Sequence, residues 1–392
     1  MIADIQQALS QEGLDGWLFY DFRQSNPIAY QILGLSQQAF YSRRWFYFVP
    51  VQGTPVALVS AVEAHVLQEL PGRRLVFRTW QEMREHLGSL LTRGARIAME
   101  YSPMNAIPYI ARVDAGTLEL VRSYGAEVVS SANISQRFIA QLSEAQIESH
   151  REAGRRLIAA KDTLLQQIGA DLRNGVPLDE YGVQQRFAAL IQEQGLVLDE
   201  DPLVAVNGNA SNPHYTPGVL TNSPIQRGDL VLLDFWAHLP TPDAIFADYT
   251  WMCFAGTKEE IPEHQRAIFG LVRQARDTGV DFVRRRLASG EAVQGREVDD
   301  VVRQVIADAG YGEFFVHRTG HNIGTFEHGN GANLDNFETQ DERQLLPATC
   351  CSVEPGIYLP EFGVRSEINL LIHERDVEIT GVPAQVEIVP LL

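Results

Sequence analysis

The sequence predicts an α+β protein in which a smaller α/β domain precedes a larger domain of helices and sheets. The chain has 392 residues, more than one typical domain requires. Short apolar runs alternate with helical patterns up to about Leu142, as in an α/β domain. From Ser143 onward, long helical patterns and strand patterns fall in separate blocks. We therefore expect one domain over residues 1–142 and a second over residues 143–392.

Four apolar runs in the first domain have the length and composition of buried strands. They are Gly16–Asp21, Arg44–Pro50, Pro55–Ser60 and Arg96–Glu100. Helical periodicity predicts helices over Glu63–Leu70 and Trp80–Leu91. The first residues, MIADIQQALSQEG, form an amphipathic helix pattern that lacks the apolar core of a signal peptide.

Capping signals mark the helices of the second domain. Ser143 and Gln146 form a capping-box pattern at the start of a helix that runs to about Leu172. Thr257 and Glu260 form another ahead of a helix that runs to about Ala288. Further helices are expected over Leu178–Gln194 and over Glu297–Ala309, which ends before Gly310. Strand patterns occur over residues 230–237, 245–254, 348–359 and 363–372.

Composition limits the possible functions. The formal charge is 32 − 50 = −18, which argues against a general nucleic-acid-binding protein, because such a protein needs a basic surface. Most of this acidity is typical of a solvated surface, and part of it could surround bound cations. Cys253, Cys350 and Cys351 have no spacing typical of a disulfide framework or a zinc site. No apolar run approaches the roughly 20 residues that span a membrane. We expect a cytoplasmic protein without a membrane partner.

Two aspartates interrupt apolar strand patterns. Asp234 lies in LVLLDFWA, where a buried carboxylate is costly unless it is paired or bound to a metal. Asp248 lies in IFADYTWMCF, and Thr250 shares its strand face and could orient its carboxylate. Pro240 and Pro242 between these strands predict a hairpin.

Two glutamates repeat the pattern further along the chain. Glu354 interrupts CCSVEPGIYL, and Glu367 lies in GVRSEINLLI, where a period of two places it on one face with Arg365 and Asn369. The PEFG between these segments predicts a second hairpin. Each acid taken alone is explained by pairing with an arginine. Because Arg365 is the only basic residue inside these strand patterns, shared cations explain the four acids better.

His321, in the glycine-flanked segment HRTGHNIG, adds a possible nitrogen ligand. A lone histidine is more often structural, but beside four unpaired carboxylates it is a plausible metal ligand. Two divalent cations would neutralise the four carboxylates and so reduce the cost of burying them. Ligands rich in oxygen favour manganese, with cobalt or zinc as alternatives. Two such ions can activate water and polarise a carbonyl, which is hydrolytic chemistry.

The order Asp, Asp, His, Glu, Glu, together with G-H-x-I-G and V-E-P-G, resembles the pita-bread metallopeptidases. These include methionine aminopeptidase, aminopeptidase P, prolidase and the metal-free creatinase. The resemblance runs from about Ser143 to the C-terminus and implies a pita-bread domain preceded by a creatinase-like α/β domain. It implies that Asp248 and Glu367 bridge two metal ions and that Glu354 also shuttles the proton of the attacking water. The implied metal ligands are Asp234, Asp248, His321, Glu354 and Glu367.

The resemblance also implies residues around the substrate. His214, in NPHYTPG, matches the histidine near the leaving group, and His317 and His328 match two further active-site histidines of the proline-specific branch. Arg365 matches the active-site arginine of that branch. The bond before proline is a tertiary amide whose departing nitrogen must be protonated, and His214 and His328 are the candidates to assist. The alternatives are core hydrogen bonds for the histidines and a pair with Glu367 for Arg365.

The complete ligand set and the N-terminal domain distinguish between the branches of this family. Creatinase has lost the metal ligands, and methionine aminopeptidases usually lack such an N-terminal domain. The resemblance therefore implies a prolidase that cleaves Xaa-Pro dipeptides, small peptides with proline second, and that forms a homodimer. One alternative is an Xaa-Pro aminopeptidase for longer peptides, although aminopeptidase P usually has a longer N-terminal domain. Another is a non-catalytic peptide-binding module, against which the complete ligand set speaks.

Several positions depart from the family pattern. The two aspartates stand further apart than usual, and HGNGANLD at residues 328–335 replaces the familiar H-E-x-P. Asn322 stands where glycine is usual, and Trp251 where arginine is common. Arg43 and Arg44, before an aromatic strand, are either a surface pair or a contact to a substrate carboxylate in a neighbouring subunit.

Overall fold

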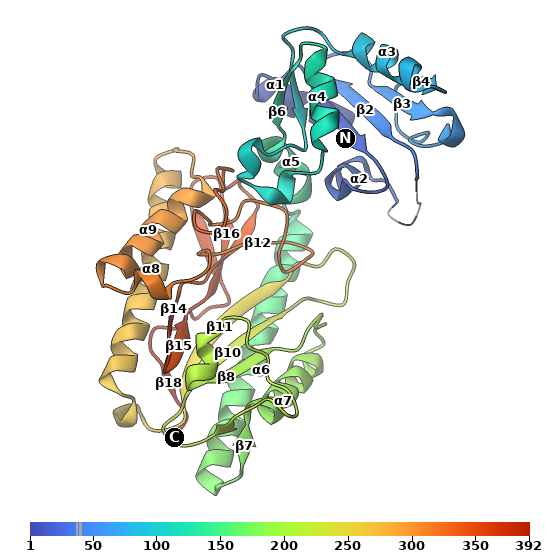
Figure 1. The fold of residues 1–392 in the computed structure, drawn as a ribbon. Coiled ribbons are helices and arrows are strands. Elements are labelled where there is room, and N and C mark those ends of the chain that lie inside the picture. The colour runs from blue at the N-terminus through green and yellow to red at the C-terminus, as the bar shows by residue number, and fades with distance from the viewer. Residues whose placement is uncertain (37, 39–40) are drawn as a thin grey trace. The chain divides into compact units, whose positions relative to one another are not determined.

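The computed structural model describes residues 1–36, 38 and 41–392. These residues form two compact units, Met1–Ile139 and Ala140–Leu392 (Figure 1). Each unit has hydrophobic clusters of its own. The division lies close to the boundary expected before Ser143, and the assignment of residues 1–142 and 143–392 as separate domains stays a prediction.

The first unit is built on a mixed sheet of six strands in the order β4-β3-β2-β1-β5-β6. The strands are β1 Gly16–Asp21, β2 Trp45–Pro50, β3 Val56–Ser60, β4 Arg73–Phe77, β5 Arg96–Met99 and β6 Glu127–Ser130. The helices are α1 Ile2–Gln11, α2 Pro27–Leu33, α3 Trp80–Leu90, α4 Ala115–Ser123 and α5 Ala132–Ile139. The expected α/β class is confirmed, because helices lie between the strands of this sheet along the chain. The sheet is mixed, because β1 pairs antiparallel with β2 but parallel with β5. The four strands expected from apolar runs are present as β1, β2, β3 and β5.

The helix expected over Glu63–Leu70 is wrong. The structure has a single 3₁₀ turn, η1 Ala61–Glu63, followed by turns. Leu67 has φ of 60°, which a right-handed helix of L-residues cannot contain. Val66 and Leu67 are nevertheless buried. The apolar spacing in this segment therefore reflects burial in an irregular loop.

The helices of the second unit are α6 Glu144–Asn174, α7 Glu180–Glu193, α8 Glu263–Ala288 and α9 Gly295–Asp308. The capping box of Ser143 and Gln146 is confirmed at the start of α6. The box of Thr257 and Glu260 forms too, but it caps only one 3₁₀ turn, η5 Lys258–Glu260. The long helix begins after Pro262, because a proline disfavours helical conformation in the residue before it.

The second unit holds two four-stranded sheets and two strand pairs. One sheet has the order β18-β11-β10-β8, from β8 Leu203–Val206, β10 Leu230–Ala237, β11 Ala247–Phe254 and β18 Val389–Pro390. The other has the order β12-β13-β16-β17, from β12 Asn322–Ile323, β13 Cys350–Val353, β16 Ile368–Ile372 and β17 Val377–Thr380. The pairs are β14 Gly356–Leu359 with β15 Phe362–Arg365, and β7 Leu178–Asp179 with β9 Pro224–Ile225. The hairpin expected around the two aspartates is confirmed as β10–β11.

The last two expected strands are each broken into two. Strand β13 pairs with β16, whereas β14 pairs with β15, so the chain changes partners at Glu354 and again at Glu367. Pro355 has no backbone N–H and cannot continue the ladder at the first break. The expectation of one continuous strand through Arg365, Glu367 and Asn369 is therefore wrong, because the strand stops at Arg365 and resumes beyond Glu367. The side chains of Arg365 and Glu367 nevertheless both contact the hydroxyl of Thr250.

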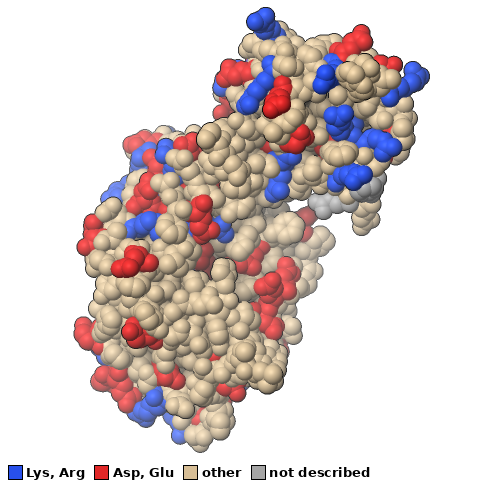
Figure 2. Space-filling model, in the orientation of Figure 1, with Lys and Arg blue, Asp and Glu red and all other residues tan. Residues whose placement is uncertain are grey.

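Acidic and basic side chains are scattered over the face that Figure 2 shows. Among the described residues, no helix is long and apolar enough to cross a membrane. The three cysteines are buried and free.

Candidate metal centre and active-site cavity

A cavity of about 810 Å³ in the second unit is lined by every residue that the sequence analysis selected as a ligand or substrate contact. These are Asp234, Asp248, His321, Glu354 and Glu367, with His214, His317, His328 and Arg365. Other lining residues include Glu200, Asp201, Trp236, Arg318, Glu327 and Glu338. The volume falls within the range of about 300–1,000 Å³ that is typical of small-molecule pockets.

The register of the β10–β11 hairpin places the two aspartates in this cavity. Asp234 lies opposite Thr250, and Trp236 lies opposite Asp248. Because alternate residues of a strand share a face, Asp234, Asp248 and Thr250 all lie on one side of the hairpin. Asp248 is only 3% exposed, so its charge requires a partner.

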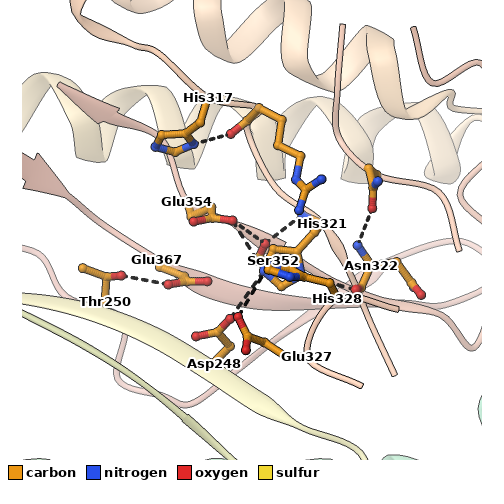
Figure 3. Close-up of polar contacts among 12 residues, drawn as sticks. Asp248, Thr250, His317, His321, Asn322, Glu327, His328, Ser352, Glu354 and Glu367 are labelled. Atoms are coloured by element: carbon orange, nitrogen blue, oxygen red, sulfur yellow. Dashed lines mark hydrogen bonds and ion pairs between the residues drawn. The ribbon is translucent and has the colours of Figure 1, made fainter. Parts of the chain in front are cut away.

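The two strand breaks supply the glutamates. Glu354 follows β13, and the hydroxyl of Ser352 donates to its Oε1 at 3.1 Å. The same hydroxyl accepts the backbone N–H of His321 at 2.9 Å, so Ser352 joins two predicted ligands. Glu367 follows β15, and the hydroxyl of Thr250 lies 2.8 Å from its Oε2 (Figure 3).

His321 lies between these carboxylates. Its Nε2 is 3.4 Å from Oδ2 of Asp248 and 3.5 Å from Oε1 of Glu354. Donor atoms that share one ion at about 2.1 Å lie about 3.0–3.4 Å apart, so these separations are close to those around a common metal. Burial lowers the pKa of His321, which keeps the imidazole neutral and able to act as a ligand. A Cβ at Gly320 would lie 2.1 Å from the backbone oxygen of Ser352, so only glycine allows this approach.

Two buried carboxylates have oxygen atoms without partners. Oδ1 of Asp248 and Oε1 of Glu367 form no hydrogen bond among the described residues. Burial, together with repulsion between neighbouring carboxylates, raises the pKa of both groups well above the usual values. Asp248, His321 and Glu367 each offer a donor atom, and these atoms lie within 4.8 Å of one another. A divalent cation would satisfy the free oxygens and remove the repulsion, so this donor set fits a metal.

Asp234 differs from the other acids because both of its oxygens have partners. Arg365 pairs with Oδ2 through Nη2, and the Thr250 hydroxyl lies 3.1 Å from Oδ1. Nε of Arg365 also donates to Oγ1 of Thr250 at 2.8 Å. Arg365 is thus paired with Asp234 and not with Glu367, the partner considered in the sequence analysis. A carboxylate has about four lone-pair sites, so these contacts leave Asp234 able to bind an ion.

Replacing Thr250 with valine should weaken metal binding by about 10–100-fold, the usual effect of losing a group that orients metal ligands. The hydroxyl contacts the carboxylates of both Asp234 and Glu367, and valine keeps the shape of the side chain without its polar atom. Calorimetric titration of Mn²⁺ into the metal-stripped protein measures the change. Thr278→Val is the matched control, because that hydroxyl bonds only to a helix carbonyl on α8. Equal affinities for the two variants would show that Thr250 does not orient the carboxylates.

The three histidines predicted to contact the substrate, His214, His317 and His328, differ in their exposure at the cavity wall. Nδ1 of His317 bonds to the backbone oxygen of Arg318 at 2.6 Å, and its Nε2 accepts from the Tyr358 hydroxyl at 2.7 Å. Burial lowers the pKa of His317 to about 4, so this ring is neutral. The ring of His328 lies edge-on to that of His321 at 4.3 Å. His214 and His328 are exposed, whereas His317 is half-buried.

The sequence analysis missed Glu327, which lines the cavity, and Tyr358, which contacts two of the lining residues. The hydroxyl of Tyr358 joins His317 to Nη1 of Arg365, which lies 3.3 Å away. Nothing in the local sequence distinguishes Tyr358 from a core tyrosine of a strand. Glu327 also lines the cavity, and burial raises its pKa to about 7. In the sequence Glu327 is an ordinary acidic residue directly before His328, so nothing there marked it as part of the site.

Buried carboxylates and a neutral histidine around unsatisfied oxygens define a metal-dependent class of protein. The chain belongs to metallopeptidase family M24, whose model matches residues 148–374. Membership implies divalent metal ions and confirms the resemblance drawn from the sequence motifs.

Individual relatives agree with this assignment. The chain is 34% identical over 203 residues to a Xaa-Pro dipeptidase of Lactobacillus delbrueckii subsp. lactis, a match that covers 51% of this chain and 50% of that protein. The chain thus spans about half the length of this relative. A prolidase structure from Thermococcus sibiricus matches over 99% of this chain and 98% of that chain, at 19% identity and a TM-score of 0.60. An X-prolyl aminopeptidase structure from Caenorhabditis elegans matches over 98% of this chain and 62% of that chain, at 17% identity and a TM-score of 0.63. The structural matches confirm the expected pita-bread fold.

Proposed function

We propose that the cavity holds two divalent metal ions and hydrolyses the aminoacyl-proline bond of Xaa-Pro dipeptides. The observation that carries this proposal is the cluster of Asp248, His321 and Glu367, with its unpartnered buried oxygens. Asp248 and Glu367 would be two of the residues that hold these ions. Oxygen-rich ligation favours Mn²⁺, with Co²⁺ or Zn²⁺ as alternatives. The full proposed ligand set is Asp234, Asp248, His321, Glu354 and Glu367.

When bound, such ions supply a Lewis acid for the scissile carbonyl and lower the pKa of a water molecule. The role of Glu354 is to accept the proton of the attacking water and to pass it toward the departing nitrogen. Ser352 holds Oε1 of Glu354, which fixes the orientation of the carboxylate. His214 and His328 line the cavity from exposed positions, so either can donate a hydrogen bond to a substrate group beside the departing nitrogen.

Arg365 and His317 support the substrate side of the cavity. A hydrogen-bonded chain runs from Asp234 through Arg365 and Tyr358 to His317. This chain fixes the ring of His317 as a neutral side chain at the cavity wall. We propose that Arg365 and His317 together shape the pocket for the proline side of the substrate.

The names of the relatives support a substrate with proline at the second position. The Lactobacillus relative is a Xaa-Pro dipeptidase and the Thermococcus neighbour is a prolidase. The second candidate is an aminopeptidase that removes the first residue of longer Xaa-Pro peptides. It is supported by the match to the X-prolyl aminopeptidase, which is described as having a di-nuclear active site.

The manganese-loaded protein should cleave Ala-Pro faster than Ala-Pro-Ala if the proposed dipeptidase activity is correct. A dipeptidase recognises the free carboxylate of proline, which the tripeptide lacks at that position. Both peptides are offered to metal-stripped protein refilled with Mn²⁺, and release of alanine is measured. Faster cleavage of the tripeptide would establish the aminopeptidase instead, and cleavage of neither peptide would favour a non-catalytic peptide-binding module.

We also propose a cytoplasmic location, which the free cysteines of a reducing compartment support, and a homodimer, which the resemblance implies. Arg43 is exposed, and its Nη1 donates to the Ser42 hydroxyl, while Arg44 is half-buried. The mass in solution, from sedimentation equilibrium, distinguishes a monomer from a dimer.

A further inference from the structure

Glu327 places a further carboxylate beside the candidate metal centre. His321, Glu327 and His328 each offer a donor atom, and these atoms lie within 4.8 Å of one another. The group shares His321 with the cluster formed by Asp248 and Glu367. Figure 3 shows Glu327 and Asp248 on the same side of the His321 ring.

The protein contacts of Glu327 do not account for its position. Its side chain is only 27% exposed, although it lies in a loop between exposed residues. Its ion-pair contact is with Nε2 of His328 at 3.5 Å, which is longer than a normal N–H···O hydrogen bond of 2.7–3.2 Å. Among the described residues, no lysine or arginine pairs with it. A carboxylate held in a cavity without a strong partner is costly unless a cation joins it.

We propose that Glu327 is an additional carboxylate ligand of the ion that His321 holds, an inference that rests on the proposed metal-dependent function. The ring of His328 packs edge-on against that of His321, and its Nε2 lies 3.5 Å from Oε1 of Glu327 within the same group of donor atoms. The competing role for Glu327 is to bind the free amino group of the substrate, which would affect substrate affinity without affecting the metal.

Metal binding without substrate separates these roles. Metal-stripped protein is titrated with Mn²⁺ by calorimetry, and the metal retained after dialysis is measured by elemental analysis. Glu327→Gln keeps the size of the side chain and should weaken the binding of one ion by tenfold or more. Glu338→Gln is the matched control, because Glu338 lines the same cavity but accepts the backbone N–H of Arg318 at 2.8 Å.

Asp248→Asn tests the underlying metal site in the same experiment. If Asp248→Asn loses metal while Glu327→Gln binds as tightly as the unaltered protein, the role of Glu327 is overturned and the proposed function stands, even if Glu327→Gln raises KM. An equal loss in Glu338→Gln would also overturn the proposal, because it would reveal a general effect of cavity charge. If Asp248→Asn retains full affinity, the proposed metal site itself is wrong.

Discussion

Replacing Glu354 with alanine or glutamine should abolish measurable hydrolysis of Ala-Pro, with kcat lowered by about 10²–10⁴-fold, the range for loss of a general acid–base group. Glu354 lies at a strand break in the cavity, where Ser352 fixes one of its oxygens and Nε2 of His321 is 3.5 Å away. Glutamine keeps the shape of the side chain but cannot accept the proton of the attacking water. Steady-state kinetics of the manganese-loaded variants measures the effect.

Metal content must be followed in these variants, because Glu354 is also a proposed ligand. A variant that retains both ions but has lost turnover identifies the proton shuttle, whereas a variant that has lost an ion identifies the ligand role. Glu361→Gln is a suitable control, since Glu361 lies in the exposed β14–β15 turn. Unchanged activity in both Glu354 variants would contradict the assignment of the active site.

The sequence identified candidate site residues where a charged side chain interrupted an otherwise apolar strand pattern. Asp234 and Asp248 stand out because they interrupt apolar strands, and the hairpin register then brings them to one face. His321 was selected from its glycine-flanked segment, and the structure shows why Gly320 is needed. The hydroxyl of Thr250 was expected to orient the carboxylate of Asp248, but it contacts those of Asp234 and Glu367 instead.

The other features of the site could not be predicted from the sequence, because they depend on contacts between residues that are distant in the chain. The breaks at Glu354 and Glu367 arise because adjoining strands pair with different neighbours, and a periodic sequence pattern does not show which strands pair. Glu327 lies in a loop where a carboxylate is ordinary, so only its proximity to His321 makes it notable. The partner of Arg365 likewise depended on a strand 131 residues away.

The metal-free protein should lose stability as pH rises, and Mn²⁺ should restore it. Burial and like charge raise the pKa of Asp248 and Glu367 in the folded state, whereas in the unfolded chain these groups titrate near pH 4. Below about pH 4 both states are protonated, so these groups do not affect stability. Above it the unfolded state loses protons that the folded state retains, so the free energy of unfolding falls with rising pH until the folded pKa is passed.

The measurement is a series of Tm values between pH 5 and pH 8 with and without Mn²⁺. Each ion present at a hundredfold excess over its Kd adds about 2.7 kcal/mol to the free energy of unfolding, so Tm should rise by several degrees at pH 8. The rise should be smaller at pH 5, where protons compete for the same carboxylates. Metal-free Asp248→Asn removes one of the two charges and should be more stable at pH 8 than the unaltered metal-free protein. A metal-free Tm that is constant across this range would mean that Asp248 and Glu367 are not forced together in the absence of a cation.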